Sequence, residues 1–188
     1  AIRMAHNPHE PELMHMCDSM GFLVINEAFD KWETEFDEFA RDDKDFMSTW
    51  NKDLTTFVKR DRNHPSVVLW SAGNETMEQL MNPERGVEIL DKLYERFREL
   101  DPGREVTCAM HPHGEDPSRL IHLSDIVSYN YRVEDFNTWR EAFPGYTFIG
   151  SETKVYREGK VENWREIDFS KNTWFMLDSA DAGQFIWA

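Results

Sequence analysis

Residues 61–75 read DRNHPSVVLWSAGNE, and this stretch decides the fold. A turn signal at Asn63-His64-Pro65 is followed by Ser66–Ala72, an apolar run with the length and the β-branched residues of a buried strand. Three residues, Gly73-Asn74-Glu75, follow at once. A strand that is buried on both faces is typical of a parallel sheet, and the polar residues after it lie where such sheets carry their sites.

The same alternation of short apolar runs with longer segments of helical period extends along the chain and predicts βα units. The predicted strands are Ala1–Ala5, Phe22–Asn26, Ser66–Ala72, Glu105–Ala109, Ile126–Tyr129, Thr147–Gly150 and Gln184–Ala188. The predicted helices are Pro11–Met20, Asp45–Asp61, a helix that begins after Asn82 and ends before Pro102, Glu134–Ala142 and Asn172–Ala180. Residues 157–169 are interpreted as a loop.

Two of these helices have a recognisable buried face. In the helix that Asn82 caps, with Pro83 in the first turn, the buried stripe is expected to be Val87, Leu90, Tyr94 and Phe97. The first helix is expected to place Leu13, Cys17 and Met20 on one face.

Seven strands joined by helical crossovers indicate either a (β/α)8 barrel that lacks one strand or an open, doubly wound sheet. An open, doubly wound sheet normally has a glycine-rich turn after its first strand, and the sequence has no such turn there. We therefore expect an α/β fold, a (β/α)8 TIM barrel that is incomplete in this chain because its first strand is missing. Neither a linker nor an internal repeat interrupts residues 1–188, which predicts a single partial barrel domain.

The composition narrows the class of partner. The 188 residues carry a formal net charge of −15, which would repel phosphates, so nucleic acid is not expected as a partner. No stretch approaches the roughly 20 consecutive apolar residues that span a bilayer, so no membrane insertion is expected. The seven tryptophans suit carbohydrate, because sugar C–H faces stack on indole rings.

Cys17 and Cys108 lie apart in apolar stretches, which predicts buried thiols rather than a disulfide or a zinc site.

Polar side chains follow nearly every predicted strand, where the βα loops of a barrel form its mouth. Two of them, Glu75 and Glu152, follow strongly apolar strands with a glycine close by. They come after the third and sixth predicted strands, on roughly opposite walls of a barrel. Glycoside hydrolysis needs such a pair, because one acid protonates the leaving oxygen while the other carboxylate attacks or activates water. A metal-dependent hydrolase is disfavoured, because His6, His64 and His111 are too dispersed to form a ligand set.

The string Asp61–Glu75 closely resembles the acid/base signature of glycoside hydrolase family 2. Arg3–Pro8 (RMAHNP) resembles an earlier strand motif of the same family, and Gly21–Asp30 (GFLVINEAFD) resembles its next strand. Gly150–Thr153 (GSET) resembles the nucleophile motif. The resemblance runs through nearly the whole chain, in the order and with the spacing of the family.

This resemblance implies a retaining mechanism, with Glu75 as the acid/base and Glu152 as the nucleophile that forms the glycosyl-enzyme intermediate. It also implies that Asn74 holds the 2-hydroxyl of the substrate and that Tyr131 hydrogen-bonds the nucleophile. The chain would then be part of a catalytic barrel domain.

Further positions are expected to line the substrate pocket or support it. By the same resemblance His6 would bind a sugar hydroxyl and Trp187 would form the floor of the −1 subsite. The remaining pocket candidates are Asn7, Asp30 and Trp32. Buried ion pairs near the barrel mouth are expected for Arg3 and Arg62, and a merely structural role is an equal alternative for Arg62.

The sequence departs from the family pattern after the second predicted strand. Some β-galactosidases of the family bind magnesium through a carboxylate and a histidine on this loop, which reads Asp30-Lys31-Trp32-Glu33 here. A lysine at the expected ligand position argues against this magnesium site, and no cofactor is expected. The family's barrel normally starts one strand earlier and is flanked by β-sandwich domains, so we expect these domains outside the 188 residues.

The function expected from these observations is that of an exo-acting β-galactosidase, with an oligosaccharide or another β-glycoside as substrate. Within the family, β-glucuronidase and β-mannosidase are the alternatives, although no Asn-x-Lys pair of the kind that binds a uronate follows Glu152. A non-catalytic carbohydrate-binding barrel is the alternative from another class. The oligomeric state and the compartment stay open, with a periplasmic or secreted location among the alternatives.

Overall fold

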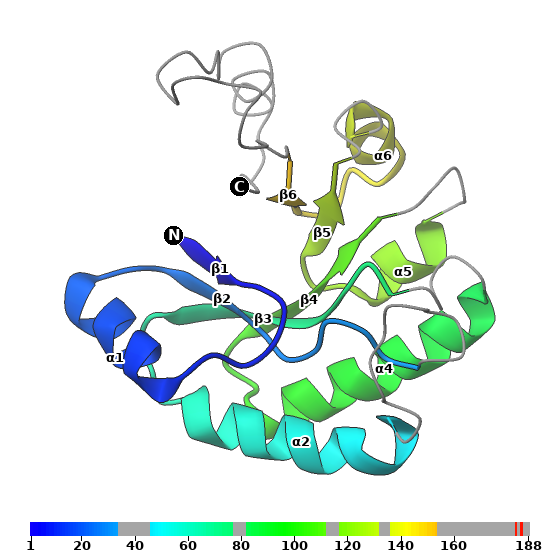
Figure 1. The fold of residues 1–188 in the computed structure, drawn as a ribbon. Coiled ribbons are helices and arrows are strands. Elements are labelled where there is room, and N and C mark those ends of the chain that lie inside the picture. Colours follow the sequence, from blue (N-terminus) through cyan, green and yellow to red (C-terminus); the bar gives the residue numbers. More distant parts are fainter. Residues whose placement is uncertain are drawn as a thin grey trace, which may run out of the picture.

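The computed structural model describes residues 1–33, 46–76, 82–111, 117–131 and 136–153, together with residues 183 and 185. Its centre is a sheet of six parallel strands, which lie side by side in the order of the sequence (Figure 1). The strands are β1 (Ile2–Met4), β2 (Val24–Glu27), β3 (Val67–Asn74), β4 (Glu105–Met110), β5 (Val127–Asn130) and β6 (Phe148–Glu152). A doubly wound sheet would reverse its strand order at a switch point, so this order confirms the incomplete barrel.

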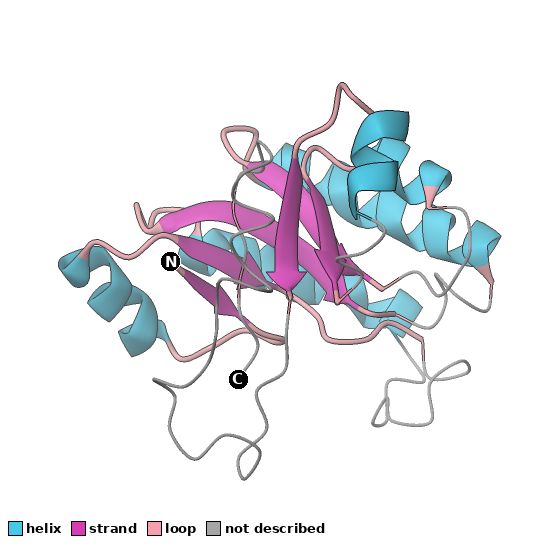
Figure 2. Cartoon of the chain, turned by 90° about the horizontal axis from the view of Figure 1, so that it is seen from above, coloured by secondary structure: helices cyan, strands magenta, loops and turns pink. Residues whose placement is uncertain are grey.

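Helices cover the outer side of the curved sheet (Figures 1 and 2). They are α1 (Pro11–Met20), α2 (Phe46–Asp61), α4 (Pro83–Leu100), α5 (Ser118–Leu123) and α6 (Phe136–Ala142). The sequence analysis missed α5, because six residues are too few to show a helical period. None of the helices in the described ranges combines the length and the apolar character that a membrane span needs.

The seventh predicted strand, Gln184–Ala188, lies outside the described residues except for Phe185. The backbone of Gly150 in β6 accepts a hydrogen bond from Phe185 N at 2.6 Å and donates one to Gly183 O at 3.1 Å. This is the pattern of a parallel neighbour of β6. The predicted helix Asn172–Ala180 and the predicted loop 157–169 also lie outside the described residues.

The core lies between the sheet and its helices and is centred on Trp70 of β3. Its indole packs edge-on against Phe57 of α2, with ring centroids 5.3 Å apart, and also contacts Phe97 of α4 at 5.8 Å. The stripe predicted for α4 is buried at three of its four positions, whereas Val87 is only half-buried. Asn82 caps this helix as predicted, its side chain accepting a hydrogen bond from the Arg85 backbone at 3.2 Å.

The prediction for α1 is wrong at its last residue. Met14 and Cys17 are buried, whereas Met20 is 64 % exposed. At 3.6 residues per turn Met20 lies about 20° from half-buried Leu13 around the helix, so its exposure comes from its place as the last residue of α1, before the cap at Gly21. Both Cys17 and Cys108 are buried free thiols, as predicted.

Asp101 joins the end of α4 to the core. Its carboxylate accepts hydrogen bonds from the Trp70 indole at 2.9 Å, from Arg104 at 2.6 Å and from the Gly103 backbone at 3.4 Å. Burial by itself would raise the pKa of Asp101, but the bonds from Arg104 and Trp70 outweigh it and hold the pKa below its ordinary value. The ionised carboxylate therefore stabilises the folded state.

The substitution Asp101→Asn should destabilise the protein by about 2 kcal/mol at pH 7, because a charged acceptor of three hydrogen bonds is lost. The pKa is lowered on folding, so this contribution is present above the unfolded value of about 3.9 and is lost as the pH falls through the folded value. Thermal unfolding at pH 7 and pH 3 measures the difference, with Asp53→Asn on the exposed face of α2 as the control. An equal deficit at both pH values would contradict the electrostatic origin.

Candidate active site

The carboxyl ends of the strands meet at one edge of the curved sheet and carry a connected set of polar side chains. Glu27, Asn74, Asn130 and Glu152 are the last residues of β2, β3, β5 and β6, and all four are buried. Parallel strands bring their ends to the same edge, which is why residues up to 125 positions apart along the chain can converge here. The site is thus fixed by strand ends rather than by long loops.

Arg3 of β1 lies at the centre of this set. Its guanidinium donates to Glu152 at 2.7 Å, to Glu27 at 2.9 Å and to the Asn74 side-chain oxygen at 2.8 Å. Burial would lower the pKa of Arg3, but the charges and hydrogen bonds of Glu27 and Glu152 outweigh it and raise that pKa. One permanent positive charge therefore compensates two buried carboxylates, as expected for Arg3.

Both oxygens of Glu152 have donors. Oε1 accepts from Arg3 and lies 3.7 Å from the His6 ring, while Oε2 accepts from the phenol of Tyr131. Burial first, and then the neighbouring Glu152 carboxylate, raise the pKa of Tyr131, so the phenol keeps its proton and remains a donor. The side chain of Glu152 is only 3 % exposed, and its two held oxygens fix the orientation of the carboxylate.

Glu75 has a different environment. Its side chain is 25 % exposed, and Oε1 accepts from Asn130 at 2.8 Å and lies 3.4 Å from the His111 ring. Its backbone is left-handed, with φ of 44°, a conformation that costs a non-glycine residue roughly 1–2 kcal/mol. The bond from Glu75 N to Ala109 O, 2.9 Å long, holds this turn and directs the side chain to the strand ends.

Asn74 and Asn130 connect the two glutamates. The Asn74 oxygen accepts from Arg3 and, at 3.1 Å, from Asn130, which also donates to Glu75. Ser151 fixes the Asn130 amide by donating to its oxygen at 2.6 Å. The sequence analysis did not name Asn130 as a site residue, although its place at the end of a strand, level with Glu152, was a usable signal.

Two of the other predicted pocket residues lie in or beside this network. His6 lies in the site, 2.9 Å from Glu27, and Asp30 is 3.5 Å from the Asn74 amide nitrogen. Asn7 is exposed and, among the described contacts, does not join this network. Trp187 lies outside the described residues, so its position stays untested.

One of the pocket expectations was wrong. Trp32 does not line a pocket: it is fully buried beside β3, where its indole donates to Ala72 O at 3.1 Å. It packs so closely on Gly73 that a Cβ there would lie 2.8 Å from the indole nitrogen, which explains the glycine before Asn74.

Arg62 is exposed and donates to the carbonyl oxygen of Leu100 at 2.9 Å. It lies in the turn before β3, at the opposite end of that strand from Glu75, so of its two expected roles the structural one fits.

Lys31 occupies the loop where some relatives were expected to hold magnesium. Its ammonium group donates to the carbonyl oxygens of Asn74 at 3.0 Å and Glu75 at 3.2 Å, and it lies 3.6 Å from Asp30. A fixed cation already neutralises these oxygens, so the residues present do not fit a divalent ion at this position.

The two glutamates therefore form an asymmetric pair at the strand ends. One carboxylate is buried and held at both oxygens by a cation and a phenol, and the other is partly open and held at one oxygen. Such a pair can supply a fixed nucleophile together with a group that exchanges protons with solvent.

The comparisons with known proteins agree with this geometry. The model of the family described as "Glycosyl hydrolases family 2, TIM barrel domain" matches residues 1–155, which include Glu75 and Glu152. Beta-galactosidase BoGH2A of Bacteroides ovatus is 34 % identical over 187 residues, covering 81 % of this chain and 21 % of that protein. A beta-glucuronidase of Streptococcus agalactiae is 31 % identical, covering 69 % of this chain and 23 % of its own length. The chain thus spans about a fifth of these relatives.

Solved structures show the same fold. The crystal structure of a glycosyl hydrolase family 2 member from Bacteroides cellulosilyticus superimposes with a TM-score of 0.83 at 30 % identity, covering 99 % of this chain and 22 % of that one. The strand order, the paired glutamates and the family match lead to one assignment: the chain belongs to glycosyl hydrolase family 2 and forms part of that family's TIM barrel domain.

Proposed function

We propose that the protein to which this chain belongs is a retaining exo-β-glycosidase, specifically a β-galactosidase, that works by double displacement. Glu152 is its nucleophile and Glu75 its acid/base. The observation that carries the proposal is the asymmetry of the pair: among the described residues, Glu152 has donors on both carboxylate oxygens and Glu75 has a donor on one. The barrel fold would be equally compatible with other chemistries, so the proposal rests on the site.

The surroundings of Glu152 suit a nucleophile. Attack on the anomeric carbon requires a charged, oriented carboxylate, and the Arg3 guanidinium and the Tyr131 phenol supply the compensating charge and the orientation. Tyr131 also donates its backbone N–H to the Glu152 carbonyl oxygen at 2.6 Å. The Tyr131 ring and the Glu152 carboxylate therefore extend from backbone segments that are bonded to each other. When one oxygen of Glu152 has bonded to the sugar, the Tyr131 phenol can keep a hydrogen bond to the other oxygen.

Glu75 suits an acid that becomes a base in the second step. The group must deliver a proton to the leaving oxygen and later take one from water, and its partial exposure leaves it in exchange with solvent. Asn130 holds one of its oxygens and His111 lies beside it. Both contacts are made by Oε1, and within the described residues the second oxygen of Glu75 is left for the glycosidic oxygen.

Asn74 is proposed to bind the 2-hydroxyl of the sugar. Arg3 and Asn130 both donate to its oxygen, which fixes the amide so that its N–H2 group faces away from them. The bond from this N–H2 group to Asp30 is long, at 3.5 Å, so a substrate hydroxyl can compete for it. His6 and Trp187 are proposed to contact other parts of the same sugar.

The choice of sugar rests on one comparison. The relative from Bacteroides ovatus, which matches 81 % of this chain, is a beta-galactosidase. β-Glucuronidase is the second candidate, because the relative from Streptococcus agalactiae has that name.

A panel of aryl β-glycosides tests the sugar. The full-length protein should hydrolyse the β-galactoside faster than the β-glucuronide and the β-mannoside, measured as kcat/KM. Glu152→Gln serves as the blank, so that activity from a contaminant is not counted. Preference for the glucuronide would transfer the proposal to β-glucuronidase, and absence of hydrolysis across the panel would favour a carbohydrate-binding role.

A retaining site should hold its two carboxyl groups about 5–5.5 Å apart and release the β-anomer first. Proton NMR of the anomeric signal during early turnover measures this directly. Initial release of the α-anomer, or a separation in the range of about 6.5–9.5 Å in a crystal structure, would contradict Glu152 as nucleophile.

The two glutamates should respond differently to substitution by glutamine. Glu152→Gln should abolish turnover of every substrate, because no glycosyl-enzyme can form. Glu75→Gln should slow natural disaccharides by about 10²–10⁴-fold yet spare glycosylation by a dinitrophenyl glycoside, whose leaving group needs little protonation. Rapid-quench measurement of the first turnover separates the two steps.

The matched control is Glu12→Gln on the exposed face of α1, which should keep full activity. If Glu75→Gln lowered the first-turnover rate equally for both kinds of leaving group, its role as the acid would be refuted.

A further inference from the structure

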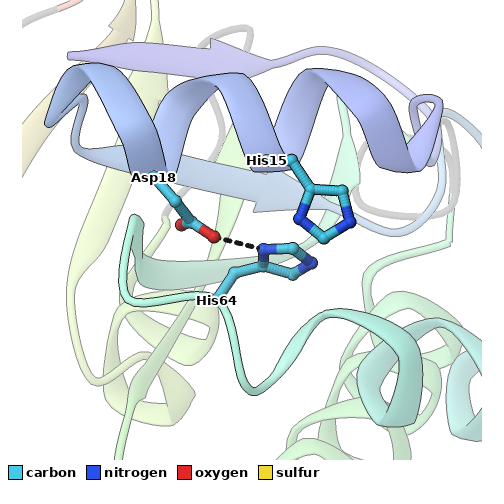
Figure 3. Close-up of side chains that lie close together, drawn as sticks. All are labelled: His15, Asp18 and His64. Atoms are coloured by element: carbon cyan, nitrogen blue, oxygen red, sulfur yellow. Dashed lines mark hydrogen bonds and ion pairs between the residues drawn. The ribbon is translucent and has the colours of Figure 1, made fainter.

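A second polar cluster lies at the other end of the sheet from Glu75 and Glu152. His15 and Asp18 are three residues apart on α1, and His64 lies in the turn that precedes β3. Figure 3 shows the side chains of His15 and Asp18 pointing from the helix toward His64. Nothing in the proposed glycosidase chemistry uses these three residues.

The three side chains are close enough to share one ligand. His64 Nδ1 and Asp18 Oδ2 are 2.6 Å apart, and the ring centroids of His15 and His64 are 4.9 Å apart at an angle of 61° (Figure 3). One ligating atom from each residue lies within 4.8 Å of those of the other two. Two imidazoles and one carboxylate form the ligand set that zinc and similar divalent ions prefer.

Two of the three groups are held in place. The backbone of His64 donates to Asp61 O at 3.0 Å, and its carbonyl oxygen accepts from Arg104 at 3.1 Å. The second carboxylate oxygen of Asp18 accepts from the Ser66 backbone N–H at 3.0 Å, which orients the first oxygen toward His64. Outer contacts of this kind orient the ligands of protein metal sites.

We propose that His15, Asp18 and His64 bind a divalent transition-metal ion, with Zn²⁺ as the reference ion. The ion takes the place of the hydrogen bond between Asp18 Oδ2 and His64 Nδ1. His15 supplies a ring nitrogen as the third ligand, and water completes the tetrahedron. The proposal is independent of the proposed glycosidase activity.

The geometry requires little movement. Ligand atoms of a tetrahedral zinc site with bonds of about 2.0–2.1 Å are roughly 3.3 Å apart. The Asp18–His64 pair has to open slightly from 2.6 Å, and His15 has to approach from within 4.8 Å. Because His15 is exposed on α1, a change of its side-chain rotamer supplies that approach.

Zinc titration of the full-length, tag-free protein tests the proposal, after dialysis against a chelator and in competition with a chromophoric chelator. Wild type should bind one more equivalent of zinc than His15→Ala does, or bind it at least about tenfold more tightly. Co²⁺ in place of zinc should give visible absorption bands of a tetrahedral site in wild type and not in His15→Ala. His15→Ala is the informative variant, because its side chain is exposed and its loss leaves the Asp18–His64 pair intact.

His122→Ala is the matched control, since it removes a histidine from another surface helix, α5. It should bind zinc and Co²⁺ as wild type does. Far-UV circular dichroism spectra without metal should agree among wild type and both variants, which shows that the fold is kept. Equal zinc stoichiometry and affinity in wild type and His15→Ala, or a Co²⁺ spectrum that the substitution leaves unchanged, would overturn the proposal.

Discussion

The guanidinium group of Arg3 lies between Glu27 of β2 and Glu152 of β6, with hydrogen bonds of 2.9 and 2.7 Å to these buried carboxylates. In a flat sheet of six strands, β1 and β6 would be about 24 Å apart at a spacing of about 4.8 Å per strand. The direct contact between their side chains is possible only because the sheet curls toward a barrel. Loss of the cation would leave buried carboxylates without a counter-charge, at a cost of about 3–5 kcal/mol.

The network that starts at Arg3 also explains why two similar residues acquire different environments. It reaches Glu152 directly and Glu75 only through Asn74 and Asn130. Glu152 belongs to a regular strand and is buried by its neighbours, whereas Glu75 follows β3 on a left-handed residue and turns toward solvent. The division of roles proposed for the pair thus has its physical origin in the backbone at the ends of two strands.

Buried polar groups are concentrated at both ends of β3. At the carboxyl end they form the candidate active site, and at the amino end the Asp18–His64 pair holds the turn that starts the strand. Between these ends Trp70 and Trp32 pack the strand against its helices, each with its indole N–H bonded, to Asp101 and to Ala72. A rigid β3 keeps Glu75 in place, because its position depends on the strand that precedes it.

Much of this architecture could be predicted from the sequence, because its signals are local. Apolar runs and helical periods indicated the parallel strands and all but one of the described helices. The polar residues after the runs indicated Glu75 and Glu152 as candidate site residues, and the family resemblance added Asn74. Other features depend on partners distant in the chain. Asn130 belongs to the candidate site because it is hydrogen-bonded to side chains of β3 and β6. Trp32 lies outside the pocket because its indole donates to a carbonyl oxygen of β3. Arg62 likewise bonds the end of α4 rather than a carboxylate.

The sequence by itself determined which side chains lie at the ends of strands. Only the tertiary structure decided which of these side chains meet, because the curvature of the sheet sets the distances between the strand ends.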